Sequence, residues 1–128
     1  MIMHSPHCPF CNLPADRALL AISETVFAIY DGYPVNPGHA LIIPKRHVTN
    51  YFELSEEEQA ACFRLLNDVK AVVEREYRPD EFNVGINVEE AAGQTVGHVH
   101  IHLIPRYWGD VGEPRGGVRG VIPSKQQY

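Results

Sequence analysis

With 128 residues, of which 45% are hydrophobic and 21% charged, the chain is long enough for one globular domain with a buried core, and a second full domain is nearly excluded. Its formal net charge of −5 argues against a basic nucleic-acid-binding surface. No apolar run approaches the roughly 20 residues of a membrane span, and the N-terminal residues lack a signal-peptide pattern. We therefore expect one domain over 1–128, a cytoplasmic location, and neither a nucleic-acid nor a membrane partner.

The first predicted elements are strands. Two short apolar runs at 18–23 and 26–30, separated by Glu24 and Thr25, predict a hairpin. Glycines and prolines between 32 and 38 indicate a loop. The mostly aliphatic run 39–44 predicts a further strand, which ends at a proline.

One long helix is predicted next. Ser55 and Glu58 have the spacing of a capping box, which satisfies free N–H groups of a helix's first turn. The helix should end at Arg78, because the residue before Pro79 avoids the α conformation. Its apolar face is broad for one helix on one sheet, so this face either packs into a deep core or makes a subunit contact. The apolar residues at helical spacing are Cys62, Phe63, Leu65, Leu66, Val69, Val72 and Val73.

The last third of the chain predicts two more strands, at 82–88 and 96–105, with a glycine-containing loop over 89–97. The tail from 107 is rich in glycine and should be irregular, apart from a short strand pairing over 117–122. About five strands around one long helix predict an α+β fold with an antiparallel sheet.

Three histidines alternate along the last predicted strand, at His98, His100 and His102. Side chains on a strand alternate between its faces, so these three should share an open face. The apolar residues that should share the buried face are Val99, Ile101 and Leu103. Three interpretations are open: a solvated polar face, a zinc site, and nucleophilic catalysis by an imidazole. The last two are compatible with each other.

The loop before these histidines favours an anionic ligand. Gly93 and Gly97 allow close approach of a ligand to the backbone, and Gln94 and Thr95 between them add an amide and a hydroxyl. Such a group suits a phosphate. The chain contains neither the Walker A pattern nor G-x-G-x-x-G, which disfavours P-loop and Rossmann chemistry.

The run from His98 to Ile104 has the H-φ-H-φ-H-φ-φ pattern of the histidine triad (HIT) family, which this chain resembles. Further segments that resemble the family are 31–39, ending at His39; 42–47, ending at His47; and Asn87 with 93–96. The resemblance covers roughly 8–107, which we expect to form the domain core, with 108–128 as an irregular tail. The tail over 114–120 resembles a bacterial branch related to diadenosine polyphosphate hydrolases.

The resemblance implies a five-stranded antiparallel sheet with one long helix, and a homodimer with a continuous two-subunit sheet. It also implies hydrolysis or transfer at the α-phosphate of a nucleotide. His100 would attack phosphorus and form a covalent nucleotidyl-histidine that water resolves. His102 would polarise phosphate oxygens, and His39 would complete the cluster.

The resemblance also implies a nucleotide-binding set. Asn87, Gln94 and Thr95 match positions that contact phosphates, and Asp31 matches the acid that holds the ribose hydroxyls. A carboxylate that accepts two hydroxyls is a strong, oriented contact. Candidates for the walls of the base pocket, close to the ribose site, are Phe27 and Ile29.

The Cys8-Pro-Phe-Cys11 segment admits two interpretations. It resembles a glutaredoxin-type redox motif, but no strand precedes it as that motif requires. The other interpretation is one structural zinc ion per chain, because some family members pair such a motif with residues at the positions of His47 and His98. Nearby rivals for one ligand position are His4 and His7. Four protein ligands would leave no open position on the metal and leave His100 free as nucleophile.

The expected activity is a nucleotide hydrolase or nucleotidyl transferase. Its substrate would be a dinucleoside polyphosphate, a nucleoside phosphoramidate or a similar nucleotide. One alternative is a phosphorylase, in which phosphate replaces water as the acceptor. Another is a nucleotide-binding adaptor with little turnover, against which the presence of a nucleophile at His100 argues.

Overall fold

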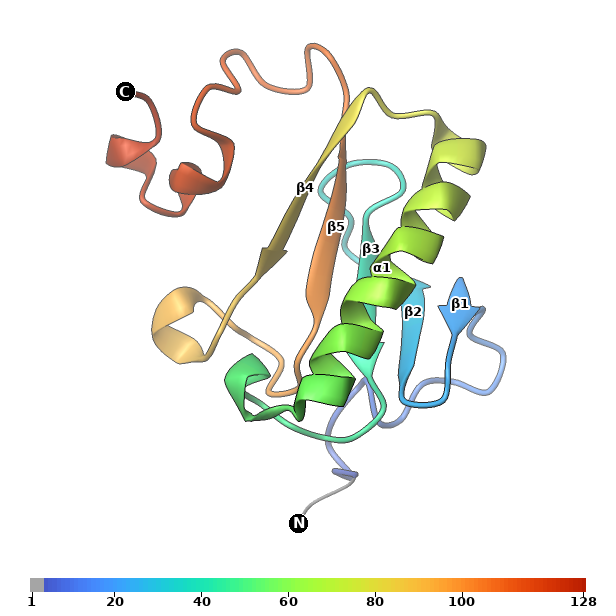
Figure 1. Ribbon diagram of the computed structural model, residues 1–128. Helices are drawn as coiled ribbons and strands as arrows, with labels where there is room; N and C mark the ends of the chain where they lie inside the picture. The colour runs from blue at the N-terminus through green and yellow to red at the C-terminus, as the bar shows by residue number, and fades with distance from the viewer. Residues whose placement is uncertain (1–3) are drawn as a thin grey trace.

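The computed structural model describes residues 4–128 as a five-stranded antiparallel sheet with one long helix across one face (Figure 1). The elements are β1 (Ala21–Ile22), β2 (Val26–Tyr30), β3 (Ala40–Pro44), α1 (Glu56–Tyr77), β4 (Glu81–Ile86) and β5 (Ile101–Arg106), with sheet order β1-β2-β3-β5-β4. The predicted α+β class is confirmed. The single domain is expected over 1–128. Residues 1–3 of that range lie outside the described residues.

The predicted hairpin forms with a shorter first strand. Ala21 of β1 pairs with Ala28 of β2, and the Leu20 N–H donates to the Ala28 carbonyl at 2.8 Å. β2 then pairs antiparallel with β3 along its whole length. The completely buried β3 lies in the middle of the sheet.

Both predicted ends of α1 are confirmed. The Ser55 hydroxyl accepts the Glu58 N–H at 3.1 Å, and the Glu58 carboxylate accepts the Ser55 N–H at 2.9 Å, which completes the capping box. Arg78 adopts a left-handed conformation (φ 52°, ψ 51°) and ends the helix. The residue before Pro79 is thereby kept out of the right-handed α region.

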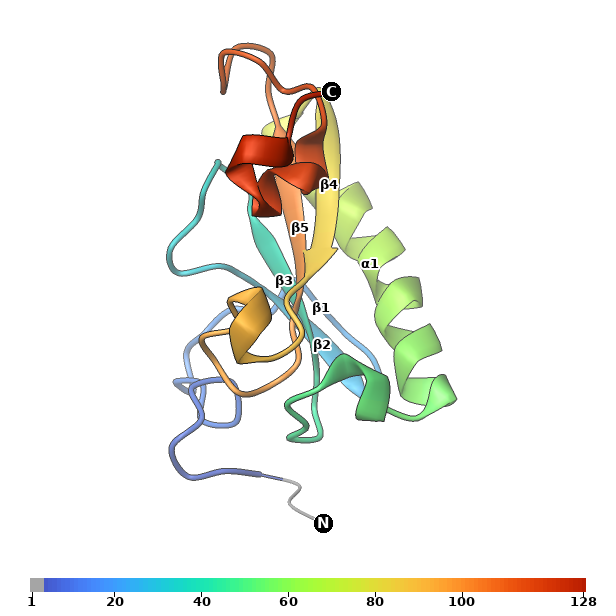
Figure 2. The same ribbon diagram turned by 90° about the vertical axis from the view of Figure 1, so that its left-hand side faces the viewer.

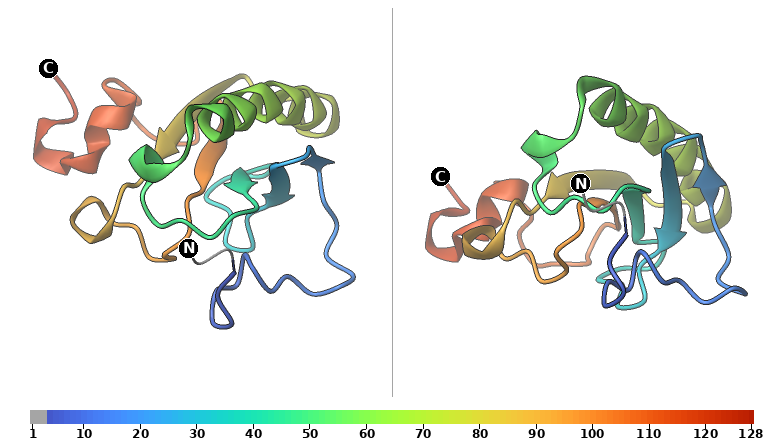
Figure 3. Two further views of the ribbon diagram at one scale, coloured as in Figure 1. Left: turned by 60° about the horizontal axis from the view of Figure 1, so that its bottom comes forward. Right: turned by 90° about the horizontal axis from the view of Figure 1, so that it is seen from below.

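The sheet is covered on both faces (Figure 3). On one face, α1 contributes Ala61, Cys62, Leu65, Val69 and Val73 to a core with buried residues of β2, β3 and β5. On the other face, Phe10 and Leu13 of the N-terminal segment pack against Phe27, Ile29, Leu41 and Ile43. The exposed Phe63 lies outside this packing, so the core accounts for only part of the broad apolar face of α1.

The strand predicted over 96–105 is wrong at its start, because β5 begins only at Ile101. The His98 N–H donates to the Val96 carbonyl at 2.8 Å in a tight turn, and the Val99 N–H donates to the Val48 carbonyl at 2.7 Å. These bonds replace the sheet ladder over 96–100. The predicted burial of Val99, Ile101 and Leu103 is confirmed, and they lie in one core cluster with residues of α1.

The expected open face for the three histidines is also wrong for two of them. His98 is 0% and His100 is 7% exposed. The covering residue is Phe10, whose ring lies 5.8 Å from the His98 ring and 5.2 Å from the His100 ring.

The tail forms two short 3-10 helices, η3 (Gly117–Val121) and η4 (Pro123–Lys125), so the strand pairing predicted over 117–122 is wrong. Gly116 and Gly117 have positive φ angles of 90° and 47°, which break an extended strand. Figure 2 shows these turns in front of β4 and β5, on the face away from α1. Along residues 4–128, no helix has the length and apolar character that crossing a bilayer requires.

Candidate functional site

Two cysteines and two histidines from three parts of the chain meet at the N-terminal end of β5. Cys8 Sγ lies 3.3 Å from His98 Nδ1, and Cys11 Sγ lies 3.4 Å from His47 Nδ1. The two Nδ1 atoms are 3.2 Å apart. All four ligand atoms lie within 4.8 Å of one another. We call these four residues the Cys2His2 cluster.

The donor set of the Cys2His2 cluster fits a zinc ion. Two sulfurs and two imidazole nitrogens are a common tetrahedral zinc set. His98 Nε2–H donates to the Pro44 carbonyl at 2.7 Å, which leaves Nδ1 free to face the cysteines. His4 and His7, the rival ligands, are exposed; His4 Nε2 lies 3.1 Å from the Cys11 carbonyl, and neither imidazole joins the cluster.

The segment after β3 is tied to the start of α1, which positions His47. Arg46 donates two hydrogen bonds to the Glu58 carboxylate, at 2.9 and 2.7 Å. The Arg46 guanidinium is the largest influence on that carboxyl group and lowers the pKa of Glu58 to about 2. Glu58 therefore caps the helix and holds the residue next to His47 at the same time.

A second group of imidazoles lies further along β5, where a chain of hydrogen bonds sets the protonation of each ring. The Val35 N–H donates to His39 Nδ1 at 3.1 Å, so the proton of a neutral His39 is on Nε2. That Nε2–H donates to His102 Nδ1 at 2.9 Å, and Asp31 Oδ2 is 3.4 Å from the same Nε2. His102 then carries its own proton on Nε2, where it can donate to a ligand.

The orientation of His100 leaves one nitrogen ready to act as a nucleophile. His100 Nδ1–H donates to the His98 carbonyl at 2.8 Å. A neutral imidazole with its proton on Nδ1 has a lone pair on Nε2. The centres of the His100 and His102 rings lie 5.0 Å apart. The Nε2 lone pair of His100 and the Nε2–H of His102 can therefore act on the same bound group.

Burial favours the neutral forms of His39 and His102. Desolvation is the main cause that lowers the pKa of His102 to about 4, and the neighbouring His100 and His39 add to the shift. Desolvation also lowers the pKa of His39, although the Asp31 carboxylate opposes this shift. A neutral His102 at physiological pH is consistent with the hydrogen-bond chain.

A pocket of about 450 Å³ opens over His100 and His102. Its polar lining includes Asp31, Asn87 and Thr95, for which the family resemblance implies nucleotide binding. Its apolar wall contains Ile29, as expected for a base pocket, and also Phe10, Leu13 and Leu41. The other base-pocket candidate, Phe27, packs in the apolar cluster behind this wall. We call this space the triad pocket.

Gln94 lies apart from the other predicted phosphate ligands. Its amide NH2 donates to the Thr49 and Val96 carbonyls at 2.9 and 3.0 Å, and its Oε1 accepts the Glu89 N–H at 2.6 Å. The side chain thus braces the loop that carries Thr95 and is not part of the lining of the triad pocket. In contrast, no hydrogen bond engages the Asn87 amide within residues 4–128.

The residues that the sequence analysis did not assign to the site come mostly from the N-terminal segment. Phe10, Leu13 and Arg17 all line the triad pocket. The position of Phe10 near the histidines could have been predicted from the sequence. Phe10 lies between Cys8 and Cys11, and the zinc interpretation places both cysteines beside His98. Arg17 donates to the Tyr30 carbonyl, which fixes the segment against β2.

The loop beside the triad pocket contains a strained residue. Glu89 has φ 67° and ψ −176°, a combination that essentially only glycine adopts without a cost of order 1–3 kcal/mol. We expect Glu89→Gly to be more stable than Glu89→Ala by roughly this amount, because both variants lose the carboxylate that accepts the Asn50 amide but only glycine relieves the backbone. Urea unfolding of both variants measures the difference, and an alanine variant as stable as the glycine variant would contradict the strain.

Comparison with known proteins places these features in a family. The HIT domain model matches residues 14–109. The AP-4-A phosphorylase of Mycobacterium tuberculosis is 33% identical over 111 residues, which cover 83% of this chain and 57% of that protein. The asymmetrical bis(5'-nucleosyl)-tetraphosphatase of Schizosaccharomyces pombe is 40% identical over 104 residues, covering 81% and 57% respectively. The chain thus spans little more than half the length of these two relatives.

A solved structure shares both the fold and a link to zinc. The crystal structure of a Zn-bound histidine triad family protein from Mycobacterium smegmatis matches with a TM-score of 0.68 and 31% identity, covering 75% of this chain and 70% of that one. That protein is described as Zn-bound, and zinc is a metal that two sulfurs and two imidazole nitrogens can hold.

Proposed function

The chain belongs to the HIT domain family, and we propose that it is a nucleotide hydrolase or nucleotidyl transferase that acts at the α-phosphate of a dinucleoside polyphosphate or a similar nucleotide. The names of the phosphorylase and tetraphosphatase relatives support this class of substrate. The observation that carries the proposal is the orientation of His100, whose Nδ1–H is bound to a backbone carbonyl and whose Nε2 lone pair serves the triad pocket.

The proposed reaction has two displacements at phosphorus. His100 Nε2 forms a bond to the α-phosphorus while the bond from phosphorus to the oxygen of the leaving phosphate breaks. Water then attacks the same phosphorus and gives up one proton to the solvent, and the electron pair of the breaking N–P bond returns to Nε2. A nucleoside monophosphate and a neutral imidazole result. His102 Nε2–H would donate to the phosphate oxygens, on which charge grows during both displacements.

The surrounding residues have supporting roles in this proposal. His39 holds the His102 ring through the 2.9 Å hydrogen bond and so fixes which nitrogen of His102 carries the proton. Asn87 and Thr95, which line the same pocket, would contact phosphate oxygens. Gln94 would act indirectly, because its hydrogen bonds hold the loop that carries Thr95 in place.

Trapping the intermediate tests the proposal. Protein mixed briefly with diadenosine tetraphosphate and denatured without acid should carry one adenylyl group on the peptide that contains His100, because phosphorus–nitrogen bonds are acid-labile. The absence of the adduct during steady turnover would contradict covalent catalysis. The absence of both the adduct and turnover would favour the adaptor alternative.

A phosphorylase is the second candidate, because one of the relatives bears that name. In that reaction inorganic phosphate attacks the nucleotidyl-His100, and a nucleoside diphosphate replaces the monophosphate as product. Product analysis with and without added phosphate distinguishes the two acceptors.

We also propose that the Cys2His2 cluster binds one structural zinc ion. The two sulfurs, the two Nδ1 atoms and the hydrogen bond from His98 Nε2–H to Pro44 support this assignment. When bound, zinc would hold the N-terminal segment against the start of β5. With four protein ligands it has no open position, so the histidines of the triad pocket perform the chemistry themselves.

A homodimer is part of the same proposal. β4 is the last strand in the sheet order, and among the described residues it pairs only with β5, so one edge is available to a second copy. Its side chains include Val84, which is 40% exposed. Sedimentation equilibrium at micromolar concentration should give the mass of two chains, and a strictly monomeric protein would contradict the pairing.

Asp31 is expected to act mainly in nucleotide binding. Its Oδ1 accepts the Tyr33 N–H at 2.8 Å, and this bond aims the carboxylate at the triad pocket. Asp31→Ala should raise KM about 10- to 100-fold, because a hydrogen bond to a charged group contributes roughly 1.5–3 kcal/mol. Asp31→Asn, which keeps the side-chain volume, is the matched variant. An unchanged KM for a nucleotide substrate in both variants would show that Asp31 does not hold the ribose.

A further inference from the structure

We propose that a second pocket, walled by the C-terminal segment of this chain, binds the base of the leaving nucleotide, so that the preferred substrates carry two nucleosides. This inference rests on the proposed function, because it requires a leaving group that departs from the α-phosphate. The occupant is the nucleoside at the far end of a dinucleoside polyphosphate.

The second pocket adjoins the triad pocket. It has a volume of about 410 Å³, and we call it the tail pocket. Its lining residues are Val35, His39, Asn83, Val84, Gly85, Asn87, His102, Ile104, Gly117, Val118, Gly120 and Val121. His102 and Asn87 line both pockets, so the two spaces meet at the residues that would hold the reacting phosphate. η3 contributes the last four of these lining residues, and it lies in front of β4 and β5 in Figure 2.

The direction of the reaction assigns a different part of the substrate to each pocket. In an in-line displacement the leaving oxygen lies opposite the attacking atom. His100 and Asp31 line only the triad pocket, which therefore takes the nucleotide that is attacked. The tail pocket contains His102 but not His100. It lies on the side of His102 toward which the leaving group would depart.

The chemistry of the tail pocket fits a base better than a phosphate chain. None of its lining residues is Asp, Glu, Lys or Arg. Five aliphatic side chains form its apolar walls: Val35, Val84, Ile104, Val118 and Val121. Val118 is 61% and Val121 is 75% exposed, so a base that packed between them and the sheet would cover apolar surface that is now in water.

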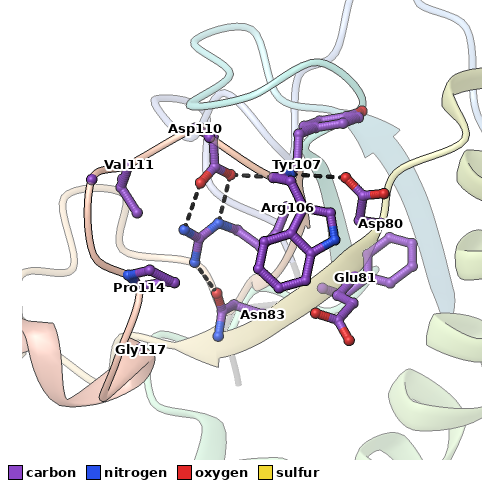
Figure 4. A pocket seen from close by; sticks show the side chains of 13 residues that line it. Asp80, Glu81, Asn83, Arg106, Tyr107, Asp110, Val111, Pro114 and Gly117 are labelled. Carbon is purple, nitrogen blue, oxygen red and sulfur yellow. Dashed lines mark hydrogen bonds and ion pairs between the residues drawn. The ribbon is translucent and has the colours of Figure 1, made fainter.

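Two amides give this apolar space polar groups that can meet the edge of a base. Asn83 Oδ1 accepts a hydrogen bond from Arg106 at 2.6 Å, and Asp110 holds the other side of Arg106 with two bonds of 2.8 Å (Figure 4). Asn83 Nδ2 is thereby oriented toward Gly117. The Asn87 amide, which makes no hydrogen bond within residues 4–128, is the second polar group.

The wall formed by the tail has a defined shape. A Cβ atom at Gly116 would lie 1.8 Å from the Gln126 carbonyl oxygen, so only glycine allows the segment to fold back at this point. The Arg119 guanidinium donates to the Lys125 carbonyl at 2.9 Å and lies 4.5 Å from the centre of the Tyr128 ring. These contacts hold η3 as a preformed surface, which lowers the entropic cost of binding.

The test compares two substrates that share one adenylyl group. Diadenosine tetraphosphate has a large leaving nucleotide, whereas adenosine 5'-phosphoramidate releases only ammonia. In Val118→Asp, the ratio of kcat/KM for the tetraphosphate to kcat/KM for the phosphoramidate should fall about 10-fold, since the variant replaces apolar surface that the base would cover with a charge. Val121→Asp should lower the ratio in the same direction. Ile122→Asp, at an exposed neighbour that does not line the pocket, is the control and should leave the ratio unchanged.

The outcomes separate this inference from the proposed function. An unchanged ratio in both valine variants, or an equal fall in the Ile122 control, would overturn the tail pocket while leaving the covalent mechanism intact. Wild-type turnover of the phosphoramidate without turnover of the tetraphosphate would do the same. If the wild type turned over neither substrate, the proposed function itself would fail.

Discussion

Replacing His100 by alanine is expected to lower kcat by at least ~10³-fold, the scale observed when a catalytic nucleophile is removed. The side chain donates one hydrogen bond to the His98 carbonyl and contacts Phe10, and neither interaction belongs to the core under α1. The variant should therefore fold, with a loss of about 1–3 kcal/mol for the unpaired carbonyl. Steady-state kinetics with diadenosine tetraphosphate, together with a thermal unfolding curve, measure both effects.

A matched control separates this effect from the general loss of an imidazole. His7→Ala removes an exposed histidine that lines neither pocket, and its kcat should equal that of the wild type. The His100 variant should also form no adenylyl adduct. Activity within tenfold of the wild type in His100→Ala would rule out the covalent mechanism.

The second large effect is expected from the Cys2His2 cluster. Purified protein should contain close to one zinc per chain, and Cys11→Ala should lower the zinc content and the melting temperature together. A metal present at 1,000 times its Kd stabilises the folded state by about 4 kcal/mol. For a chain of this length, such a loss corresponds to a melting temperature lower by about 10–20 °C. Elemental analysis and calorimetry on the same samples give both quantities.

Cys62→Ala is the matched control for this prediction. Cys62 is buried among the core residues of α1 and lies outside the cluster. Its replacement should lower stability modestly through a small cavity while the zinc content stays at the wild-type level. Activity should fall less in Cys11→Ala than in His100→Ala. A metal-free wild type with a readily oxidised Cys8–Cys11 pair would instead favour the redox interpretation.

The parts of the fold that depend on local signals were predictable. The capping box at Ser55 and the proline after Arg78 determine where α1 begins and ends, and both act over a few residues. The alternation of apolar residues correctly predicted that Val99, Ile101 and Leu103 are buried. Residue pattern alone determines such contacts, because side chains on an extended backbone alternate between faces.

The parts that depend on long-range contacts were not predictable. The start of β5 depends on a hydrogen bond from the Val99 N–H to the Val48 carbonyl, and these residues are 51 positions apart. No local sequence pattern predicts this bond. The burial of His100 depends on Phe10, which reaches it from the far end of the chain. The roles of Asp31, Asn87 and Thr95 stay predictions, although all three line one pocket with His100. The hydrogen bond from Gln94 to the Thr49 carbonyl depends on how the loop folds, so the sequence alone did not predict it.

The Cys2His2 cluster has a thermodynamic consequence for the triad pocket. Cys8 and His98 are 90 positions apart, and residues 4–20 contain neither a helix nor a strand. The cluster is therefore one attachment of this segment to the sheet, beside the packing of Phe10 and Leu13. Phe10 and Leu13 on the same segment form the apolar wall beside the nucleophile. With zinc bound, the metal and a nucleotide in that pocket would stabilise the same arrangement of the segment. By linkage, each ligand must then raise the affinity for the other by the same factor. Chelators should consequently remove the metal less readily from nucleotide-saturated protein, even though none of the four cluster residues lines the triad pocket.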